Sequence, residues 1–267
     1  MALFHTSSSL GIRPAFPRLN TGSPHARELT GWWVVVPGVG WVDASLGSRF
    51  AGTLTNGATI VSAPQGHGGW TGDFDGTDDY VSIADTPSLR IASTDDFTLS
   101  IWCRIDNTVG WRGIVTKSRD SGLYWGVWVS NTSKYNAPGG YYSTTSVTTG
   151  VHHVVLRQIG SGARQFFIDG VIDATAGSAV TADGTGIMRI GTAYTGAAYE
   201  PFDGQIWDVR LYRRALTDNE CWSLYSAATR WDLYAQPLRQ FVNMAAAAVG
   251  GGAGLRRPWR MGLMGVQ

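Results

Sequence analysis

The sequence contains few charged residues, two cysteines and three glutamates. Charged residues make up 15% of its 267 residues, well below the roughly 25% of an average globular domain. The net charge of +1 gives no overall field that would attract nucleic acid or an anionic membrane, so we expect neither as a partner. Cys103 and Cys221 are too few for a disulfide framework, and their spacing fits no zinc motif. We interpret them as two buried thiols, with one bridge between them as the alternative.

Long apolar runs are also missing, because no stretch of the sequence is long and apolar enough to span a bilayer. The first twenty residues have no basic segment followed by an apolar one, so they do not resemble a signal peptide. We therefore expect a protein that is made in the cytoplasm and is not exported by the general secretion route.

The glutamates, Glu28, Glu200 and Glu220, are scattered along the chain. Retaining glycosidases hold two carboxylates about 5 Å apart, and an E-x-D-x-E strand would place such carboxylates on one face. That motif is absent, and so are the G-x-S-x-G of serine hydrolases, a phosphate-binding loop and a His/Cys zinc cluster. We therefore expect no catalytic residues and no enzyme activity, with a glycoside hydrolase as the least favoured alternative.

Glycine and aromatic residues are abundant. The chain has 35 glycines and 12% aromatic residues, a composition that favours short strands joined by tight turns. From Trp32 to about Tyr212, short apolar or alternating segments recur between clusters of Gly, Asp, Asn and Ser. This spacing predicts an all-β antiparallel sandwich rather than alternating strands and helices. We expect strands near 32–36, 58–61, 70–74, 79–83, 97–105, 112–117, 124–130, 140–147, 151–159, 164–169, 187–191 and 205–213.

Two local signals define a helix and a turn. In "ALTDNECWSLYS", Thr217 stands at an N-cap position and Glu220 follows three residues later, which is the capping-box arrangement. The pair predicts one short helix from about 218 to 227. Asp169-Gly170, between "RQFFI" and "VIDA", predicts a tight hairpin.

Both ends of the chain differ from this pattern. Residues 1–30 contain three prolines and no sustained period, and residues after Asp232 combine arginines with an "AAAAVGGGAG" linker and no acid. We therefore expect an extended N-terminal arm at 1–30, a sandwich at 31–227, and a linker with a basic and apolar arm at 228–267. Ordering such arms costs about 1–2 kcal/mol per residue. Contacts with neighbouring subunits, in a homo-oligomer or a larger assembly, would offset that cost.

The stretch "FDGTDDYV" at 74–81 brings three aspartates together. Asp is favoured in turns because its side chain bonds to nearby backbone, so Asp75, Asp78 and Asp79 are interpreted as part of a hairpin. Loops rich in carboxylates also suit calcium, which takes several oxygen ligands at about 2.4 Å. A structural calcium ion is therefore the alternative, and no other cofactor is expected.

Aromatic residues supply the candidates for ligand binding. Exposed tyrosine and tryptophan rings offer a flat apolar face with a polar handle, which suits sugar rings or a protein interface. The alternative is that the rings fill the core and flank it, because aromatic residues are favoured in strands. The candidates are Trp111, Tyr124, Trp128, Tyr135, Tyr141 and Tyr142, with Tyr194 and Tyr199 as further loop tyrosines.

An ordered set of motifs resembles the laminin G-like domains of the concanavalin A-like lectin/glucanase superfamily, over about residues 31–226. The most specific motifs are "FDGTDDYV", "HHVV…FIDG" and "GQIWDVRLYRRALT". The resemblance implies a jelly-roll sandwich whose chain ends approach each other, and binding of glycans or proteins. Many such domains bind calcium at one rim, which would add Asp208 to the candidate ligands. Relatives often carry Asp where this chain has Trp207, and that departure weakens the calcium site.

The terminal arms resemble the construction of bacteriophage virion proteins. We therefore expect a non-catalytic, lectin-like sandwich displayed on a virion or another large assembly, as a decoration or attachment protein whose arms dock onto capsid or other subunits. The alternative is a glycan-binding module for a cell-surface or host polysaccharide. The two functions are compatible with each other.

Overall fold

The computed structural model describes residues 13–14, 17–47, 50–119, 122–176, 184–194 and 199–235. The chain divides into two compact units, residues 1–235 and 236–267. All described residues belong to the first unit, and the end of the predicted C-terminal arm lies outside them. None of the helices among the described residues has the length and apolar character needed to cross a membrane.

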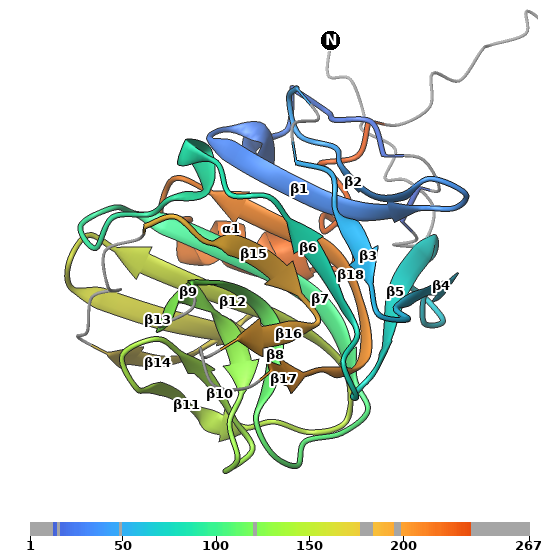
Figure 1. The fold of residues 1–267 in the computed structure, drawn as a ribbon. Coiled ribbons are helices and arrows are strands. Elements are labelled where there is room, and N and C mark those ends of the chain that lie inside the picture. The colour runs from blue at the N-terminus through green and yellow to red at the C-terminus, as the bar shows by residue number, and fades with distance from the viewer. Residues whose placement is uncertain are drawn as a thin grey trace, which may run out of the picture. The chain divides into compact units, whose positions relative to one another are not determined.

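In the described part of the chain, the larger sheet has nine antiparallel strands (Figure 1). Their order is β14-β13-β12-β7-β18-β1-β5-β4, with β2 paired to β1. The central strands β7 and β18 pair with each other, and β12 pairs with β7 along its whole length. The strands are β1 (Leu29–Val36), β2 (Gly40–Asp43), β4 (Thr59–Ser62), β5 (Trp70–Asp75), β7 (Phe97–Ile105), β12 (Gly150–Ile159), β13 (Ala163–Ile168), β14 (Val171–Ala176) and β18 (Asp203–Tyr212).

The smaller sheet has seven strands within the described ranges, in the order β11-β10-β9-β8-β15-β6-β3. A two-stranded ribbon, β16 and β17, accompanies it. These strands are β3 (Thr53–Thr55), β6 (Tyr80–Ile83), β8 (Arg112–Arg119), β9 (Gly122–Val129), β10 (Lys134–Ala137), β11 (Tyr141–Ser146), β15 (Ile187–Ile190), β16 (Thr192–Tyr194) and β17 (Tyr199–Pro201). The predicted all-β antiparallel sandwich is confirmed.

Period-two alternation builds the core between the sheets. The side chains that alternate along β7 are all buried there, which confirms the core face predicted for this strand. They are Phe97, Leu99, Ile101, Cys103 and Ile105. Cys103 and Cys221 are both free and buried, so the interpretation as two buried thiols is confirmed over the single bridge.

The opposite face of the larger sheet carries a second apolar core. It consists of Trp32, Val34, Trp102, Trp207, Trp231, Leu233 and Tyr234. Asp208 is fully buried beside this core and forms an ion pair with Arg210. Its carboxylate also accepts hydrogen bonds from Trp32 Nε1 (3.2 Å) and from the Tyr234 hydroxyl (2.7 Å). Both faces of the central strands are therefore buried, which explains why β18 contains no exposed side chain.

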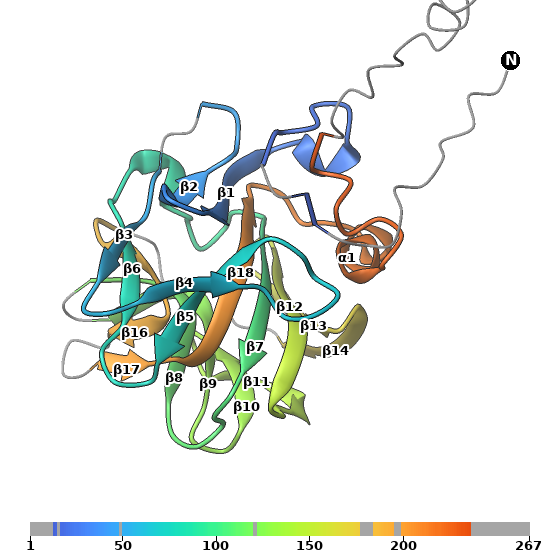
Figure 2. The same ribbon diagram turned by 90° about the vertical axis from the view of Figure 1, so that its right-hand side faces the viewer.

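Segments from both ends of the first unit cover this second core. Leu19 forms an antiparallel bridge with Tyr234, and Asn20 N donates to Leu233 O at 2.8 Å. Figure 2 shows α1 (Asp218–Tyr225) and the 3-10 turn Pro24–Ala26 beside the larger sheet. The described residues of the predicted N-terminal arm, 13–14 and 17–28, thus lie against this chain's own sandwich rather than extending from it.

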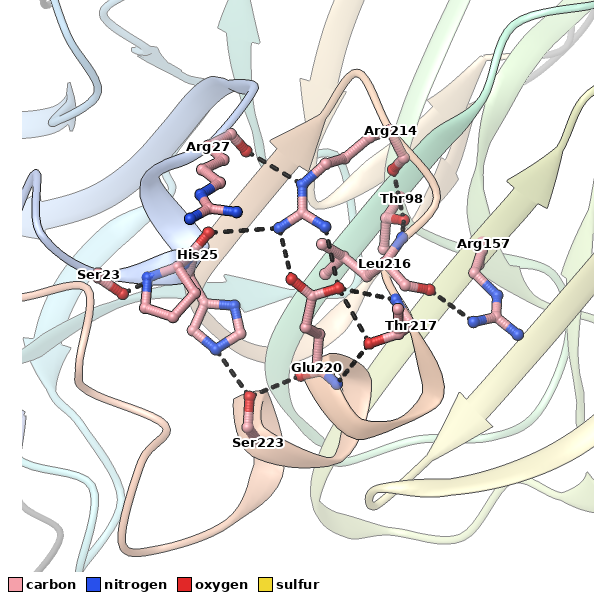
Figure 3. A network of polar contacts seen from close by, with 11 residues as sticks. Ser23, His25, Arg27, Thr98, Arg157, Arg214, Leu216, Thr217, Glu220 and Ser223 are labelled. Atoms are coloured by element: carbon pink, nitrogen blue, oxygen red, sulfur yellow. Dashed lines mark hydrogen bonds and ion pairs between the residues drawn. The ribbon is translucent and has the colours of Figure 1, made fainter.

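A polar network ties the N-terminal segment to α1 (Figure 3). The guanidinium of Arg214 forms two hydrogen bonds with Glu220 (2.7 and 2.9 Å) and also donates to the carbonyls of Pro24 and Arg27. His25 Nε2 lies 2.7 Å from Ser223 Oγ. The bond from Arg214 is the main cause that lowers the pKa of Glu220 to about 2. Helix α1 begins with the predicted capping box of Thr217 and Glu220.

The sequence missed several short strands, although it predicted β4, β6 and β15, which have four residues each. The strands β2, β3, β10, β16 and β17 have three or four residues each, and their pairing is set by neighbouring strands rather than by a local apolar period. The predicted hairpin at Asp169-Gly170 is confirmed, because both residues have positive φ (50° and 81°) between β13 and β14. This is the backbone that a two-residue turn between antiparallel strands requires.

We expect acid to weaken the anchoring of the N-terminal segment through His25. Burial, followed by the charge of Arg210, lowers the pKa of His25 from 6.5 to about 4 in the folded chain. Between these two values the unfolded chain binds one more proton. The stability that neutral His25 contributes is complete above pH 6.5 and is lost as the pH falls towards 4, by on the order of 3 kcal/mol. Because burial also lowers the pKa of His67 and of His153, the loss due to His25 is measured as the difference between the wild type and His25→Gln in thermal unfolding from about pH 7.5 to about pH 4.5.

In His25→Gln, stability should fall less steeply over the same window. His152→Gln is the matched control, because its hydrogen bond to Asp169 raises the pKa of His152, and its removal should make the fall steeper. If the curves of stability against pH were parallel for the wild type and His25→Gln, His25 would not be a source of the acid sensitivity.

Asp208→Asn should destabilise the domain by about 3–5 kcal/mol, because it leaves the buried Arg210 guanidinium without its counter-charge. Urea unfolding measures the change. Asp106→Asn is the control: Asp106 pairs with Arg104 at the surface, where an ion pair contributes at most about 1 kcal/mol. Equal, small losses in both variants would show that the buried pair is not needed.

Candidate functional site

The three aspartates at 75–79 close a turn. Asp75 Oδ1 accepts from Thr77 N at 2.8 Å, and Asp79 Oδ2 accepts from Asp75 N at 3.1 Å. Burial raises the pKa of Asp79, and the neighbouring carboxylates raise it further. The hairpin predicted for this stretch is wrong, because β5 belongs to the larger sheet and β6 to the smaller one, so the turn carries the chain from one sheet to the other.

Asp208 does not join these aspartates. It lies five residues along β18 from Asp203, the partner of Asp75, which corresponds to roughly 16 Å of strand. Its oxygens face the second core, where Arg210, Trp32 and Tyr234 occupy them. Over the described ranges, no three His, Cys, Asp or Glu side chains are grouped so that they could hold a metal ion. The four predicted calcium ligands therefore do not form one site.

The six predicted aromatic ligand residues are also dispersed. Tyr135 and Tyr141 belong to the core between the sheets, where Tyr141 stacks on Phe166 at 4.9 Å. The core alternative is therefore confirmed for these two tyrosines, and they cannot form a binding platform. Trp128 is buried, Trp111 and Tyr124 are half-buried, and Tyr142 is exposed.

The loop tyrosines form a separate cluster beside the smaller sheet. Tyr199 stacks on Tyr80 at 5.9 Å and lies 4.8 Å from Tyr194. The guanidinium of Arg189 lies 5.2 to 6.0 Å from the three ring centres. This cluster offers one exposed ring, Tyr199.

A cavity of about 320 Å³ opens at the outer face of the larger sheet. Its lining comes from the β4–β5 loop, from β7 and β12, and from the turn between β13 and β14. Helix α1 and the segment that follows it complete the lining. The lining residues are His67, Trp102, Val151, Asp169, Tyr225, Ala227 and Arg230. We call this cavity the His67–Tyr225 pocket. Its size and mixed aromatic and polar lining are typical of a small-ligand site.

Stacked rings form one wall of the pocket. Tyr225 and Trp102 are nearly parallel, with 14° between their planes and 5.9 Å between their centres. Trp102 in turn stacks on Trp207 and lies 4.8 Å from His153. Trp102 is 2% exposed and Tyr225 is 36% exposed, so the exposed end of the stack is the Tyr225 ring.

Charged groups stand on either side of these rings. Asp169 accepts hydrogen bonds from His152 Nδ1 (2.9 Å) and His153 N (2.8 Å). Burial acts to raise the pKa of Asp169, but these bonds outweigh it and hold the pKa below its usual value. The guanidinium of Arg230 lies 5.3 Å from the Trp102 ring centre. The pocket therefore presents an ionised acceptor and a cationic donor.

Several buried ring nitrogens around the pocket have no hydrogen-bond partner in the described part of the protein. They are His67 Nδ1, Trp102 Nε1, His153 Nδ1 and Trp207 Nε1. A buried polar atom left unsatisfied costs about 1–3 kcal/mol. His67 and Trp102 line the pocket, but these two nitrogens are themselves buried, so a ligand hydroxyl reaches the partly exposed carboxylate of Asp169 instead. Burial and the charges of Arg230 and Arg13 lower the pKa of His67 to about 4, which keeps its ring neutral at pH 7.

Sequence reasoning did not find this pocket. Its residues come from segments far apart in the chain, and Asp169 was interpreted only as a turn residue. One signal was available: Trp102 and Trp207 stand on the faces of β7 and β18 opposite to the predicted core face. Large aromatic residues on both faces of a strand indicate that both faces are covered.

The fold resembles that of solved carbohydrate-active and toxin structures. Domain 4 of AbnA, an extracellular arabinanase from Geobacillus stearothermophilus solved with arabinotriose, is 16% identical, with a TM-score of 0.58 over 74% of this chain and 98% of that domain. The binding domain of botulinum neurotoxin DC in complex with SialylT is 12% identical, with a TM-score of 0.56 over 75% of this chain and 51% of that one. Trypanosoma rangeli sialidase is 16% identical, with a TM-score of 0.58 over 78% of this chain and 34% of the enzyme. At these identities the likeness establishes the fold alone.

The sequence itself matches a family model. Laminin_G_3, described as the concanavalin A-like lectin/glucanases superfamily, matches residues 75–221. The match begins at the Asp75 turn, ends in α1 and covers more than half of the chain. It includes the "HHVV…FIDG" and "GQIWDVRLYRRALT" motifs, and it confirms the resemblance that they indicated. The chain belongs to the concanavalin A-like lectin/glucanases superfamily.

Proposed function

We propose that this protein is a non-catalytic glycan-binding module and that the His67–Tyr225 pocket receives the sugar. The observation that carries the proposal is the exposed Tyr225 ring, which lines the same cavity as the partly exposed carboxylate of Asp169. A sugar has an apolar face that packs on a tyrosine ring, and hydroxyl groups that bond to the polar atoms at its edge. The family and the two binding domains solved with oligosaccharides support this class of ligand.

The polar groups of the pocket suit hydroxyl groups. Each carboxylate oxygen of Asp169 accepts one hydrogen bond from the protein and keeps a further lone pair for a ligand hydroxyl. The guanidinium of Arg230, which also lines the pocket, adds N–H donors. A cavity of about 320 Å³ admits one or two sugar rings rather than a long polysaccharide segment.

The number of carboxylates in the pocket supports binding of a sugar without its hydrolysis. Asp169 is the carboxylate among its lining residues, whereas glycoside hydrolysis requires a pair about 5 Å or roughly 6.5–9.5 Å apart. Glu200, whose pKa is raised by burial, lies in β17 of the separate two-stranded ribbon. Because the superfamily includes glucanases, the binding experiment below includes analysis of the recovered oligosaccharides, which should remain intact.

Tyr225→Ala should weaken oligosaccharide binding at least about tenfold, because it removes the exposed ring on which the sugar stacks. The probes are arabinotriose, laminaritriose and sialyllactose, measured by calorimetry after a glycan-array screen. Tyr199→Ala is the matched control, since Tyr199 is an exposed tyrosine of the other cluster, at 48% exposure. Loss of binding in Tyr199→Ala alone would place the site on the smaller sheet. Failure of the wild type to bind any glycan would refute the proposal.

Display on a virion or another large particle is the second candidate, and it is compatible with the first. What supports it is the composition of the segment after Asp232, which is rich in arginine, glycine and alanine and has no acid. In this proposal residues 236–267 dock onto a neighbouring subunit.

Truncation after Ala235 tests the docking role. The first compact unit ends there, so we expect the thermal stability of the sandwich to stay the same and any self-association to be lost. Light scattering on the eluting protein measures its mass before and after truncation. A truncated chain that assembles as the full chain does would contradict a docking role for residues 236–267.

A further inference from the structure

The loop between β4 and β5 carries His67 to the pocket, yet its own sequence defines it poorly. It reads "APQGHGG" at 63–69, and Gly66, Gly68 and Gly69 all have positive φ. Glycine adopts such backbone at no steric cost but loses the most conformational freedom on folding. The loop has two backbone hydrogen bonds of its own, from His67 N to Pro64 O and from Ala63 N to Gly69 O, and contacts from other segments add to them.

Two arginines from the terminal segments make those contacts. Arg13 N donates to His67 O at 3.0 Å, Arg13 Nε donates to Gly68 O at 3.2 Å, and Arg13 Nη2 donates to Trp70 O. From the other side, Arg230 Nη2 donates to Gly66 O at 3.1 Å. Within residues 66–70, the two guanidinium groups thus bind three carbonyls through charge-assisted bonds, which are the stronger kind, and the backbone N–H of Arg13 binds a fourth.

Arg13 fits closely against the loop it holds. It is 4% exposed, and a Cβ at Gly69 would lie 2.7 Å from its Nη2 atom. Arg13 is absent from the lining of the pocket, so it does not touch the space in which a ligand lies. Its segment is fixed in turn by Leu19 and Asn20, which pair with Tyr234 and Leu233.

We infer that Arg13 is a positioning residue of the His67–Tyr225 pocket, which it completes by holding the 63–69 loop, so that ligand binding is coupled to docking of the N-terminal segment. The inference rests on the proposed glycan binding at this pocket. Coupling of this kind is reciprocal. If docking of the N-terminal segment raises the affinity for the ligand by some factor, the bound ligand raises the docking equilibrium of the segment by the same factor. A protein partner that competes for residues 13–28 would lower the sugar affinity.

The test compares Arg13→Gln with Arg27→Gln in the full chain. Arg27 is an exposed arginine of the same segment, and its replacement removes the same charge without touching the loop. The first readout needs no ligand: NMR titration of His67. Loss of Arg13 removes one nearby charge and part of the burial that lower the pKa of His67, so we expect that pKa to rise towards 6.5 in Arg13→Gln and to stay about 4 in Arg27→Gln. Amide exchange at residues 66–70 should accelerate in Arg13→Gln.

The second readout is affinity for arabinotriose and laminaritriose. Arg13→Gln should weaken binding by about fivefold to tenfold, the effect of one lost hydrogen bond, and Arg27→Gln should not. Arg13→Lys keeps the charge but not the forked donors, so an intermediate effect is expected, and this variant decides the matter if Arg13→Gln fails to fold.

The two readouts separate the two proposals. If Arg13→Gln leaves both the His67 titration and the amide exchange unchanged, the inference is overturned. It is also overturned if the titration shifts but the affinity for the oligosaccharides stays the same. If the wild type binds neither oligosaccharide while the Arg13→Gln titration shifts, the glycan proposal fails and the positioning of His67 by Arg13 is upheld.

Discussion

The buried ion pair between Asp208 and Arg210 determines how the outer face of the larger sheet can be used. Charges in an interior are tolerated only when partners offset their desolvation. Here the partners come from outside β18: Trp32 and Tyr234 donate to Asp208, and Arg210 donates to the carbonyl of Arg230. Undocking the C-terminal segment would remove the bond from Tyr234 to Asp208 and the bond from Arg210 to Arg230 O, and would expose the buried pair. This segment is therefore part of the domain, and the pocket that it borders exists only when it is docked.

The elements that the sequence predicts correctly are those whose local pattern and tertiary environment agree. β7 alternates between two buried faces, and its predicted range matches the observed one. The capping box of Thr217 and Glu220 starts α1 where it was expected. β10 (Lys134–Ala137) was missed because four residues show no clear period, and its register is fixed by β9 and β11. A strand with its own apolar alternation is predictable even at four residues, as β6 (Tyr80–Ile83) shows, whereas β10 depends on its neighbours.

The candidate site was harder to predict, because aromatic composition does not distinguish a core ring from a binding ring. Tyr141 and Tyr225 are the same residue type, yet one stacks on Phe166 inside the sandwich and the other ends an exposed stack on α1. The difference arises from which strand face is covered, and that depends on segments more than a hundred residues away. Asp169 shows the same limit: its turn role was predictable, but its position beside Trp102 in the pocket was not.

The composition of the pocket explains how a common sandwich acquires an individual ligand. Trp102, Val151 and Asp169 lie within the stretch that matches the family. The other four lining residues lie outside residues 75–221: His67, Tyr225, Ala227 and Arg230. The sheet supplies a rigid floor of stacked rings, and the added segments supply one side of the opening. A change in the added segments can alter the opening without disturbing the core between the sheets, because the two apolar cores lie on opposite faces of the sheet. Ligand specificity in such a domain is therefore a property of its extensions as much as of its family fold.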